Sequence, residues 1–368
     1  MPMIIYFQFE RQPLFFDSPL SVISANDPLE LSNCFRRMGE ALEAGYYLAG
    51  FLSYEAGYCF EERFSFSGRR DFPLLLMGVY KGPLRNSLPV ASRARGFSVK
   101  RLRINTERGE YADNIELIRR CIASGEIYQL TYCIKFLFDF SGSAGQLYSL
   151  LLKKQPVPYP AYLQWRDLHI CSLSPELFFK KRGPRILAKP MKGTWRRGDN
   201  YFSDLKEYRL FRADVKNRAE NVMIADLLRN DLGKIGGKVR APRLFEVNGY
   251  STLFQMTSTV SARVPENIPL CELFKALFPS GSVTGAPKLR AMRIIREIEK
   301  EPRNIYTGAI GYITPAREMF FNVPIRTLLI RGGQGEMGIG GGIVWDSTAD
   351  GEWNEGVLKA EFFTSLTR

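Results

Sequence analysis

The sequence predicts an α+β fold in which antiparallel sheets dominate. Short apolar runs with strand character follow one another along much of the chain, as antiparallel hairpins require. Helical runs come in separate blocks, so the strict strand–helix–strand alternation that is typical of a parallel sheet is absent. With 368 residues, of which 45% are hydrophobic and 24% charged, the chain can bury a large core in one domain or in two fused lobes.

The first part of the chain alternates strands with one helix. The expected elements are strands at 3–9, 46–54 and 73–80 and a helix at 27–44. The helix has apolar residues at helical spacing and ends at Gly45. Residues 81–97 are rich in Pro, Gly, Ser and Arg, which indicates a boundary. We therefore expect an N-terminal lobe at 1–95 and a catalytic region at 96–368, interleaved into one globule.

The second part opens with a helix and continues mainly as hairpins. The expected helices are 107–124, 147–154, 214–232, 288–301 and 352–359, and the expected strands are 127–140, 161–165, 169–174, 177–181, 185–188, 320–330 and 339–345. Each helix shows apolar residues at helical spacing or a stop at Gly or Pro, and each strand is a short apolar run. The strand pair that ends at Ala188 leads the chain directly to Lys192.

The composition excludes several classes of site and protein. Six cysteines without a Cys-x-x-Cys pair indicate buried thiols in a reducing compartment. The one histidine, His169, rules out multi-histidine metal sites and lies in a strand-like segment, where a structural role is favoured. No apolar run approaches the roughly 20 residues of a membrane span, and the N-terminus has no cleavable signal pattern. We expect a cytoplasmic protein without membrane contact.

The net charge of +13 suits either nucleic acid or an anionic metabolite. The excess is spread along the chain, with one dense segment at 81–103 that we interpret as a solvated linker. Because no stacking motif or recognition-helix pattern accompanies it, we expect no nucleic-acid partner. A basic nucleic-acid-binding module stays open as an alternative of another class.

A lysine candidate for catalysis lies in Lys189-Pro190-Met191-Lys192-Gly193-Thr194. Pro190 favours an extended conformation at the residue before it, and Gly193 permits a positive φ or a close approach to a ligand. Lys192 is therefore expected in a short turn between two extended runs. Such a lysine is a nucleophile if its surroundings keep part of it as the free amine, although an isolated loop lysine is usually just solvated.

Two helices carry carboxylates that suit a divalent cation. The helix at 214–232 shows an apolar stripe of Ala219, Val222, Met223 and Leu227, with Glu220 at its border. The C-terminal helix places Glu352, Glu355 and Lys359 on one face. With no histidine or cysteine nearby in the sequence, these oxygen ligands favour Mg²⁺, held by one or two carboxylates, waters and substrate oxygens.

Two glycine-rich stretches fit an anionic ligand better than a nucleotide. Residues 333–338 match G-x-G-x-x-G, but an extended run follows them where a dinucleotide site needs a helix. Residues 281–288 lack the Gly-Lys-Ser/Thr of a phosphate loop, and Pro287 instead begins a helix whose first turn offers free N–H groups. Arg326, expected within the apolar strand at 320–330, needs a partner: either a structural ion pair or a ligand carboxylate.

Six motifs, in order, resemble those of the chorismate-utilising enzymes, and within them the aminodeoxychorismate synthase component I subfamily. They are Ser174-Pro175-Glu176, Lys189-Pro-Met-Lys-Gly-Thr194, Arg218-Ala-Glu-Asn-Val-Met-Ile-Ala-Asp-Leu227, Phe278-Pro-Ser-Gly-Ser-Val-Thr-Gly-Ala-Pro-Lys288, Pro324-Ile325-Arg326-Thr327 and Gly340-Gly-Gly-Ile-Val-Trp-Asp-Ser347. The match is strong over about 107–363 and loose before it. It implies a two-lobed α/β sandwich of mostly antiparallel sheets with helices packed outside, as in anthranilate synthase component I.

The resemblance also implies the role of each site residue. Lys192 would be the nucleophile and Glu176 the general acid. Glu220 and Glu355 would hold Mg²⁺, with Glu352 acting through water. The substrate, chorismate, would be held by a larger set: Arg326, Tyr306, Gly193, Thr194, Gly285, Gly340, Gly341, Gly342 and Lys359.

The implied reaction is amination of chorismate at C4 to 4-amino-4-deoxychorismate, on the route to 4-aminobenzoate and folate. Lys192 would attack ring C2, and ammonia would then replace the C4 hydroxyl. Anthranilate synthases typically carry a small residue at the position of Lys192, and anthranilate formation is the runner-up. Isochorismate and salicylate synthases place a lysine base near Gln129, so addition of water is disfavoured.

The resemblance implies two protein partners in function. A glutamine amidotransferase subunit would supply ammonia, since we find no glutamine-hydrolysing domain in this sequence, and a separate aminodeoxychorismate lyase would act on the product. Phe254 stands where the family often has histidine. For that reason a chorismate-binding protein without catalysis also stays open.

Overall fold

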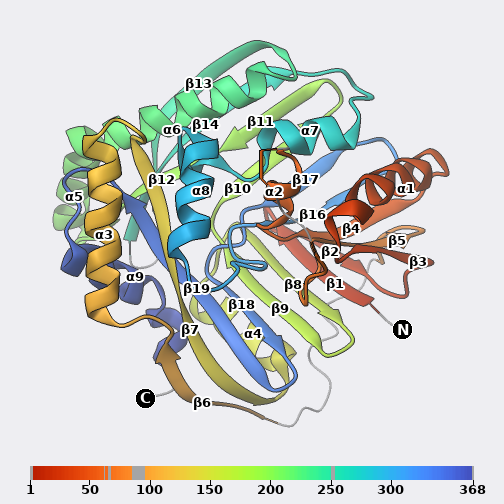
Figure 1. Cartoon of the computed structure of the whole chain (residues 1–368), viewed down its shortest axis with the longest axis horizontal. Coiled ribbons are helices and arrows are strands. Elements are labelled where there is room, and N and C mark those ends of the chain that lie inside the picture. The colour runs from red at the N-terminus through yellow and green to blue at the C-terminus, as the bar shows by residue number, and fades with distance from the viewer. Residues whose placement is uncertain (1–2, 62, 65–67, 85–95, 250–252, 367–368) are drawn as a thin grey trace.

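The computed structural model describes residues 3–366 apart from 62, 65–67, 85–95 and 250–252, and its strands form two large sheets (Figure 1). The first sheet runs in the order β15 (Gly285–Ala286), β7 (Gln129–Gly142), β19 (Gln334–Ile343), β18 (Thr327–Arg331), β9 (Leu168–Ser174), β8 (Tyr159–Trp165), β1 (Met3–Phe9) and β2 (Gln12–Phe16), with β6 (Phe97–Ile104) also on β7. The second runs β12 (Met191–Arg196), β14 (Leu253–Arg263), β11 (Arg185–Lys189), β10 (Leu177–Arg182), β17 (Met319–Asn322), β16 (Ala309–Ile313), β4 (Tyr47–Leu52), β5 (Leu75–Tyr80) and β3 (Ser21–Ala25), with β13 (Gly237–Gly249) on β14. All described pairings between named strands are antiparallel, which confirms the predicted sheet type.

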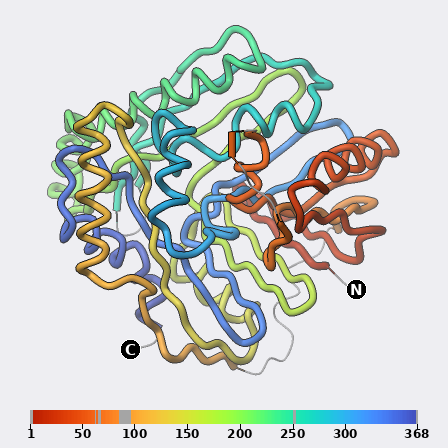
Figure 2. Tube along the Cα trace, viewed as in Figure 1, coloured from red at the N-terminus to blue at the C-terminus, as the bar shows by residue number. Residues whose placement is uncertain are grey.

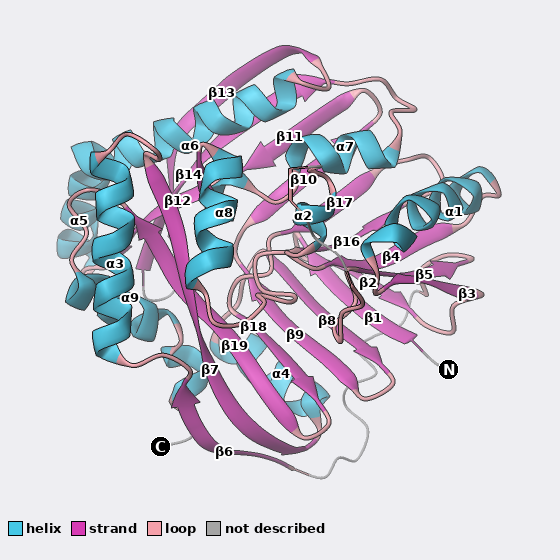
Figure 3. Ribbon diagram, viewed as in Figure 1, coloured by secondary structure: helices cyan, strands magenta, loops and turns pink. Residues whose placement is uncertain are grey.

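Helices cover the outer faces of the two sheets (Figure 3). The α-helices are α1 (Leu31–Glu43), α2 (Ala56–Cys59), α3 (Arg108–Ala123), α4 (Ala144–Lys154), α5 (Tyr201–Ala213), α6 (Val215–Gly233), α7 (Leu270–Leu277), α8 (Lys288–Ile298), α9 (Ala349–Lys359) and α10 (Glu361–Thr364), and the short 3-10 turns are η1 (Pro28–Glu30) and η3 (Gly281–Val283). One apolar cluster joins α1, α6 and α7 to the second sheet, and another joins α3, α4, α8 and α9 to the first. The predicted α+β sandwich with outer helices is confirmed.

A third apolar cluster fills the space between the sheets, because side chains alternate along each strand. On β1, Ile5 and Phe7 belong to this central cluster, whereas Tyr6 belongs to the cluster under the outer helices. On β9, Ile170 belongs to the central cluster and Cys171 to the cluster under the outer helices. This period of two is the geometry of a pleated strand that is buried on both faces.

Strands from distant parts of the chain pair with each other in both sheets. Figure 2 shows β7 and β19 lying side by side although they are far apart in the sequence, and their register runs from Gln334 opposite Asp139 to Ile343 opposite Leu130. In the second sheet, Lys192 on β12 lies opposite Met256 on β14. Long-range pairing of this kind brings separate motifs to one place.

Several predicted elements differ from the structure. The strand expected at 320–330 is broken into β17 and β18, since Pro324 cannot donate to a ladder. Residues 97–104 form β6 and so are not a linker, and the buried face of α6 contains Ile224, Ala225 and Leu228, while Ala219 and Val222 are exposed. The elements α5, α7, β12 and β13 were among those not predicted.

The predicted division into lobes falls at 85–95, which lies outside the described residues, and it stays a prediction. His169 is half-buried on β9, and its Nδ1 lies 3.0 Å from the hydroxyl of Tyr162. Among the described residues no helix is long and apolar enough to cross a membrane.

Candidate active site

A cavity of about 340 Å³ lies where β12, β19, α6 and α9 come together. It brings together all but one of the predicted site residues. The predicted residues that line it are Glu176, Lys192, Gly193, Thr194, Glu220, Tyr306, Arg326, Gly340, Gly341, Gly342, Glu352, Glu355 and Lys359. A volume of this size matches a small metabolite.

Lys192 lies in a strand, where the sequence had indicated a turn. β12 pairs with β14, and the register shifts between Lys192 and Thr194. Gly193 takes a φ of +84°, as predicted, and a Cβ there would overlap the side-chain oxygen of Asn217 on α6. A bulge of this kind re-aims a neighbouring side chain, and here it accompanies a lysine that lines the cavity.

Two glycines of β19 make room for the reactive side chains. A Cβ at Gly342 would overlap the Nζ of Lys192 and would lie 2.8 Å from the Nε2 of Gln129. A Cβ at Gly341 would lie 2.7 Å from the Oε2 of Glu352. These glycines therefore allow Lys192 and Glu352 to approach the strand from opposite faces.

The surroundings of Lys192 act on its charge in both directions. Burial lowers the pKa of Lys192, and the ammonium group of Lys359 acts in the same direction. The carboxylates of Glu220, Glu176 and Glu355 oppose this shift, but the pKa stays below its usual value. A larger fraction of Lys192 is therefore the free amine than in water, as a nucleophile requires.

Glu176 follows β9 and is almost completely buried, with 2% of its surface exposed. Burial raises its pKa to about 7, although a hydrogen bond from Ser282 and the charge of Lys192 act to lower it. The hydroxyl of Ser282 donates to Oε1 at 2.5 Å. A carboxyl group with this pKa can hold and release a proton near neutral pH.

The remaining carboxylates line the cavity from α6 and α9. Burial raises the pKa of Glu352, whose Oε1 accepts a hydrogen bond of 2.6 Å from Ser347. For Glu355, burial acts to raise the pKa, but Lys359 at 2.7 Å and Lys192 lower it further, so the group favours the charged form. The Nζ of Lys359 also donates to the carbonyl of Gly340 at 3.0 Å.

These carboxylates fit magnesium by their chemistry. Within the described part of the chain, no three His, Cys, Asp or Glu side chains form a ready-made metal cluster. Mg²⁺ does not need one, because it is commonly held by one or two carboxylates together with waters and substrate oxygens. Glu220, Glu352 and Glu355 all line one cavity, and the absence of a side chain at Gly341 leaves space beside Glu352.

Arg326 lines the cavity from the bend between β17 and β18, with a φ of +51°. Its carbonyl accepts a hydrogen bond of 3.0 Å from the N–H of Leu173, which fixes the bend. Tyr306 is buried and lines the same cavity, and a Cβ at Gly338 would overlap its ring. Both residues therefore line the cavity, although they come from separate segments of the chain.

Gly285 is the exception among the predicted site residues. It pairs with Leu130 at the edge of the first sheet, and a Cβ there would overlap the carbonyl oxygen of Gln129. Neither Gly285 nor Lys288, in the first turn of α8, lines the cavity. The expectation that these backbone amides face a ligand is therefore corrected: Gly285 serves close packing, and Lys288 pairs with Asp231 at 2.6 Å.

Sequence reasoning missed several polar residues of the cavity: Thr131, Lys216, Asn217, Gln255 and Ser282. Lys216 and Asn217 lie one helical turn before Glu220, so helical spacing was a usable signal. Strand alternation could have indicated Gln255. Its neighbours Phe254 and Met256 pack with Phe211 on the face turned away from the cavity, so Gln255 lies on the face toward it. That packing removes the reason for which Phe254 had suggested a non-catalytic protein.

The sequence model of one enzyme family, described as chorismate binding enzyme, matches residues 16–365. The chain belongs to this family. The resemblance on which the sequence analysis rested is thereby confirmed for nearly the whole length of the chain.

Curated relatives fall in two branches of the chorismate-binding family. Aminodeoxychorismate synthase component 1 of Salmonella typhimurium is 37% identical over 253 residues, which cover 68% of this chain and 56% of the relative. Anthranilate synthase component 1 of Aquifex aeolicus is 35% identical over 264 residues, covering 71% of this chain and 53% of the relative. The alignments thus span little more than half the length of these relatives.

A solved structure supports the fold independently. The crystal structure of anthranilate synthase component I from Streptococcus pneumoniae superposes with a TM-score of 0.80 at 23% identity, covering all of this chain and 91% of the other. This likeness confirms the predicted anthranilate synthase component I-like fold.

Proposed function

We propose that this member of the chorismate-binding family converts chorismate and ammonia to 4-amino-4-deoxychorismate and water. The observation that carries the proposal is Lys192: an amine with a lowered pKa faces the cavity beside Glu176, a carboxyl group with a pKa of about 7. The identity to aminodeoxychorismate synthase component 1 relatives supports the same reaction.

Chorismate carries two carboxylates, and the cavity offers two places for them. Arg326, Tyr306 and backbone amides among Gly340 to Gly342 would hold the enolpyruvyl carboxylate, since a guanidinium fork and backbone N–H groups suit a planar anion. The ring carboxylate would lie toward Glu220 and Glu355. A cation is needed there, because all three groups are negatively charged and would otherwise repel one another. The ring would then lie between Lys192 and these acids.

The reaction proceeds in two displacements on the ring. The free amine of Lys192 forms a bond to C2 as both conjugated double bonds of the ring shift and the C4–O bond breaks, and Glu176 gives its proton to the departing oxygen, which leaves as water. Ammonia then bonds to C4, the C2–N bond breaks, and Lys192 is regained. The proton lost by the incoming nitrogen returns to Glu176. The sum is chorismate plus ammonia giving the amino product plus water.

Glu220 and Glu355 would hold Mg²⁺, with Glu352 acting through a water. When bound there, the cation supplies a positive charge that neutralises the ring carboxylate and stabilises charge on the departing oxygen. Glu355 favours its charged form, which suits a metal ligand. Lys359 orients Glu355 through their 2.7 Å contact.

We further propose that a glutamine amidotransferase subunit supplies the ammonia and that a separate aminodeoxychorismate lyase uses the product. The name component 1, carried by relatives from Salmonella typhimurium and Bacillus subtilis, supports a second subunit. A cytoplasmic location fits a reaction on soluble metabolites. Anthranilate formation is the second candidate, because an Aquifex aeolicus relative of nearly equal identity is an anthranilate synthase component 1.

One incubation tests the proposed function. The purified chain is given chorismate, Mg²⁺ and a high concentration of ammonium, and the products are separated and weighed by mass spectrometry. An amino-chorismate that keeps the enolpyruvyl group supports the proposal, whereas anthranilate supports the second candidate. No turnover, together with salt-dependent DNA binding, would favour the basic binding module instead.

Gly342→Ala is expected to lower turnover while leaving the fold intact. The new methyl group takes the space of the Lys192 amine, which is the mobile end of a long side chain and can move aside. A displacement on the scale of 1 Å is expected to cost about 100-fold in kcat. Thermal unfolding should shift little.

Gly39→Ala, in α1 with open space around its Cβ position, is the matched control and should keep full activity. A Gly342→Ala protein with unchanged kcat would remove the close contact between Gly342 and Lys192 from the catalytic argument.

Glu220→Gln and Glu355→Gln are each expected to weaken Mg²⁺ binding about 10- to 100-fold, because a charged oxygen ligand becomes neutral. Isothermal titration of Mg²⁺ into the chain measures this without any turnover. Asp226→Asn, on the same helix as Glu220 but paired with Arg229 at 2.7 Å, is the control. Unaltered Mg²⁺ affinity in both Gln variants would show that the cation binds elsewhere.

A further inference from the structure

Arg303, between α8 and Tyr306, is buried with 2% of its surface exposed, and all five of its side-chain N–H groups have acceptors. Nε and Nη2 donate to the two carboxylate oxygens of Glu299 at 2.8 and 2.7 Å. Nη1 donates to the carbonyl of Val283 at 2.8 Å and to the hydroxyl of Thr307 at 3.2 Å. Nη2 also donates to the carbonyl of Thr131 at 2.7 Å. Every N–H group of the Arg303 guanidinium is therefore hydrogen-bonded within the protein.

The acceptors belong to separate walls of the catalytic cavity. Thr131 comes from β7 and Val283 from η3, and both line the cavity. Tyr306, which also lines it, donates its backbone N–H to the carbonyl of Arg303 at 3.0 Å. The side chain of Arg303 thus joins Thr131 to Val283, and its backbone carbonyl holds Tyr306. These bonds add to the pairing of β15 with β7, which already links the first two segments.

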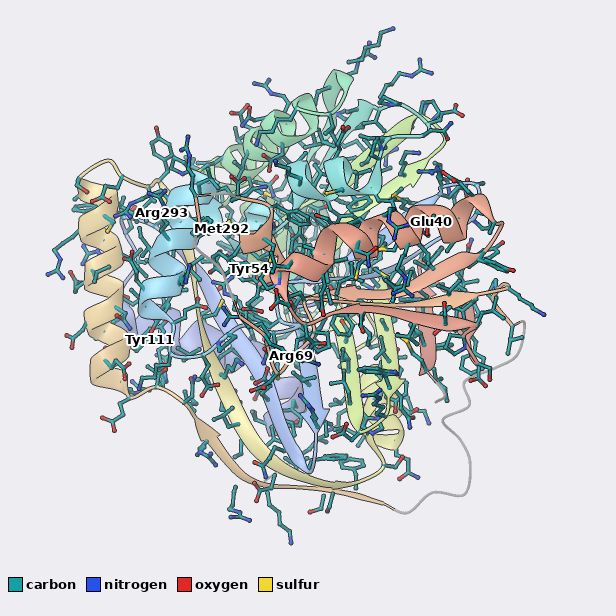
Figure 4. The ribbon with its side chains drawn as sticks, turned by 45° about the vertical axis from the view of Figure 1, so that its right-hand side comes forward. Glu40, Tyr54, Arg69, Tyr111, Met292 and Arg293 are labelled. Carbon is teal, nitrogen blue, oxygen red and sulfur yellow. The ribbon has the colours of Figure 1, made fainter. Side chains whose placement is uncertain are left out.

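Arg303 is itself fixed from the opposite side. The carboxylate of Glu55 accepts the backbone N–H groups of Arg303 and Asn304 at 2.7 and 3.0 Å. The ring of Tyr54 lies 4.4 Å from the guanidinium carbon, in a cation–π contact. Figure 4 labels Tyr54 where the N-terminal segment meets α8.

The link to the chemistry passes through Ser282. Ser282 precedes Val283, whose carbonyl Arg303 holds, and its hydroxyl donates to Glu176 at 2.5 Å. Ser282 and Val283 are consecutive residues of the single short turn η3, so a shift of the Val283 carbonyl is expected to displace Ser282 as well. Arg303 does not line the cavity, so it would act on Glu176 indirectly, through Val283 and Ser282.

We propose that Arg303 is a positioning residue that holds Ser282 against Glu176 and keeps the Thr131, Val283 and Tyr306 walls of the cavity in register. The proposal rests on the proposed function for the identity of the reaction. A buried ion pair is not in general required for stability, since apolar replacements are often tolerated. The five-way arrangement of Arg303 is better explained by the precision that the cavity walls need.

Arg303→Lys tests this role, because lysine keeps the charge but has three donors in place of a five-donor fork. We expect kcat to fall about 10- to 100-fold with a misplaced acid. The pH at which the rate declines should also move upward. The Ser282 hydrogen bond lowers the pKa of Glu176, so its loss lets that pKa rise.

Ser282→Ala removes the same hydrogen bond directly and should reproduce the upward shift of the pH profile. The double variant should shift no further than either single variant, since both act on one contact. If Arg303→Lys does not fold, Glu299→Gln is the alternative variant. It weakens the hydrogen bonds that hold the Arg303 guanidinium and should shift the pH profile upward by a smaller amount.

Lys181→Met is the matched control for the loss of stability that replacing any buried cationic side chain can cause. Lys181 is 1% exposed and donates to the carbonyls of Glu266 and Arg317, away from the cavity, so this variant should lose stability without changing the pH profile. If the unaltered chain forms no product, the proposed function fails and the role of Arg303 with it. If the unaltered chain forms product and the Arg303 and Glu299 variants keep its pH profile, only the role of Arg303 is overturned.

Discussion

Lys192→Ala is expected to abolish formation of 4-amino-4-deoxychorismate, with a fall in kcat of about 10⁴-fold or more, as for removal of other enzymatic nucleophiles. The amine that would bond to C2 is gone. Two other lysines line the cavity, but Lys359 is held by Glu355 and by the carbonyl of Gly340, and Lys216 is exposed to solvent. Separation of products by mass after incubation with chorismate, Mg²⁺ and ammonium measures the loss. Chorismate binding should persist, because Arg326 and the glycines 340–342 of β19 are untouched.

Lys189→Ala is the matched control for this experiment. Lys189 lies in the same motif, on β11, but pairs with Glu246 at 3.5 Å and does not line the cavity. We expect it to keep the activity of the unaltered chain. Should Lys192→Ala keep its rate as well, the covalent route through C2 would be wrong, and ammonia would have to attack the ring directly.

The product distribution of Lys192→Ala carries a second test. With a small side chain at position 192, ring C2 is open to ammonia, which is the position attacked in anthranilate formation. A trace of C2-aminated product from this variant, absent from the unaltered chain, would show that Lys192 also decides where ammonia adds.

The candidate active-site residues were predictable because each lies in a short motif whose residue types suggest a role. The fold then brings these motifs together at one cavity. Glu355 could be assigned to a helix face from spacing, whereas Glu220 was identified by the family resemblance, because the apolar stripe expected beside it includes Ala219 and Val222, which are exposed. Both carboxylates line the cavity. Lys192 was recognised beside Gly193, whose positive φ the structure shows. The contact between Lys192 and Gly342 was not predictable, since it depends on how β12 and β19 from different sheets approach each other.

Residues that act through backbone atoms were the hardest to find from sequence. Ser282 lies in a motif that was interpreted as a backbone anion site, and its side-chain bond to Glu176 needs the spatial meeting of η3 with the end of β9. Arg303 carried no signal at all, because its acceptors include the carbonyls of Thr131 and Val283. Carbonyl oxygens are the same in every residue, so no side-chain pattern marks them.

The strand expected at 320–330 shows that an apolar run in the sequence can continue where the strand itself is interrupted. Its apolar run is real, and both halves form strands, but Pro324 ends the first strand and Arg326 takes a positive φ in the bend. Local composition favours a continuous strand, whereas the two halves belong to different sheets. The bend between them is what brings Arg326 to the cavity.

Glu176→Gln is expected to lower kcat by about 10²- to 10⁴-fold, the usual loss when a general acid is removed. In the unaltered chain, Glu176 must hold its proton while Lys192 must have lost its own, so the pH profile should be bell-shaped, with an alkaline decline as the pH rises through the Glu176 pKa of about 7. That decline should be absent from the residual rate of the variant, because an amide does not titrate. Rates measured from pH 5.5 to 8.5 check this, with Glu272→Gln, an exposed carboxylate on α7, as the control.

The same substitution should raise stability at alkaline pH relative to the unaltered chain. The folded-state pKa of Glu176, about 7, lies above the ordinary value of 4.5, so its contribution to folding is fully present below pH 4.5 and is lost as the pH rises through about 7. Glutamine keeps the neutral, hydrogen-bonded state at every pH. The difference in melting temperature, variant minus unaltered chain, should therefore grow between pH 5 and 8, while Glu55, also buried with a pKa of about 7, contributes equally to both proteins. A difference that stays constant over this range would mean that Glu176 is already charged in the folded protein, and a charged carboxylate cannot protonate the departing oxygen.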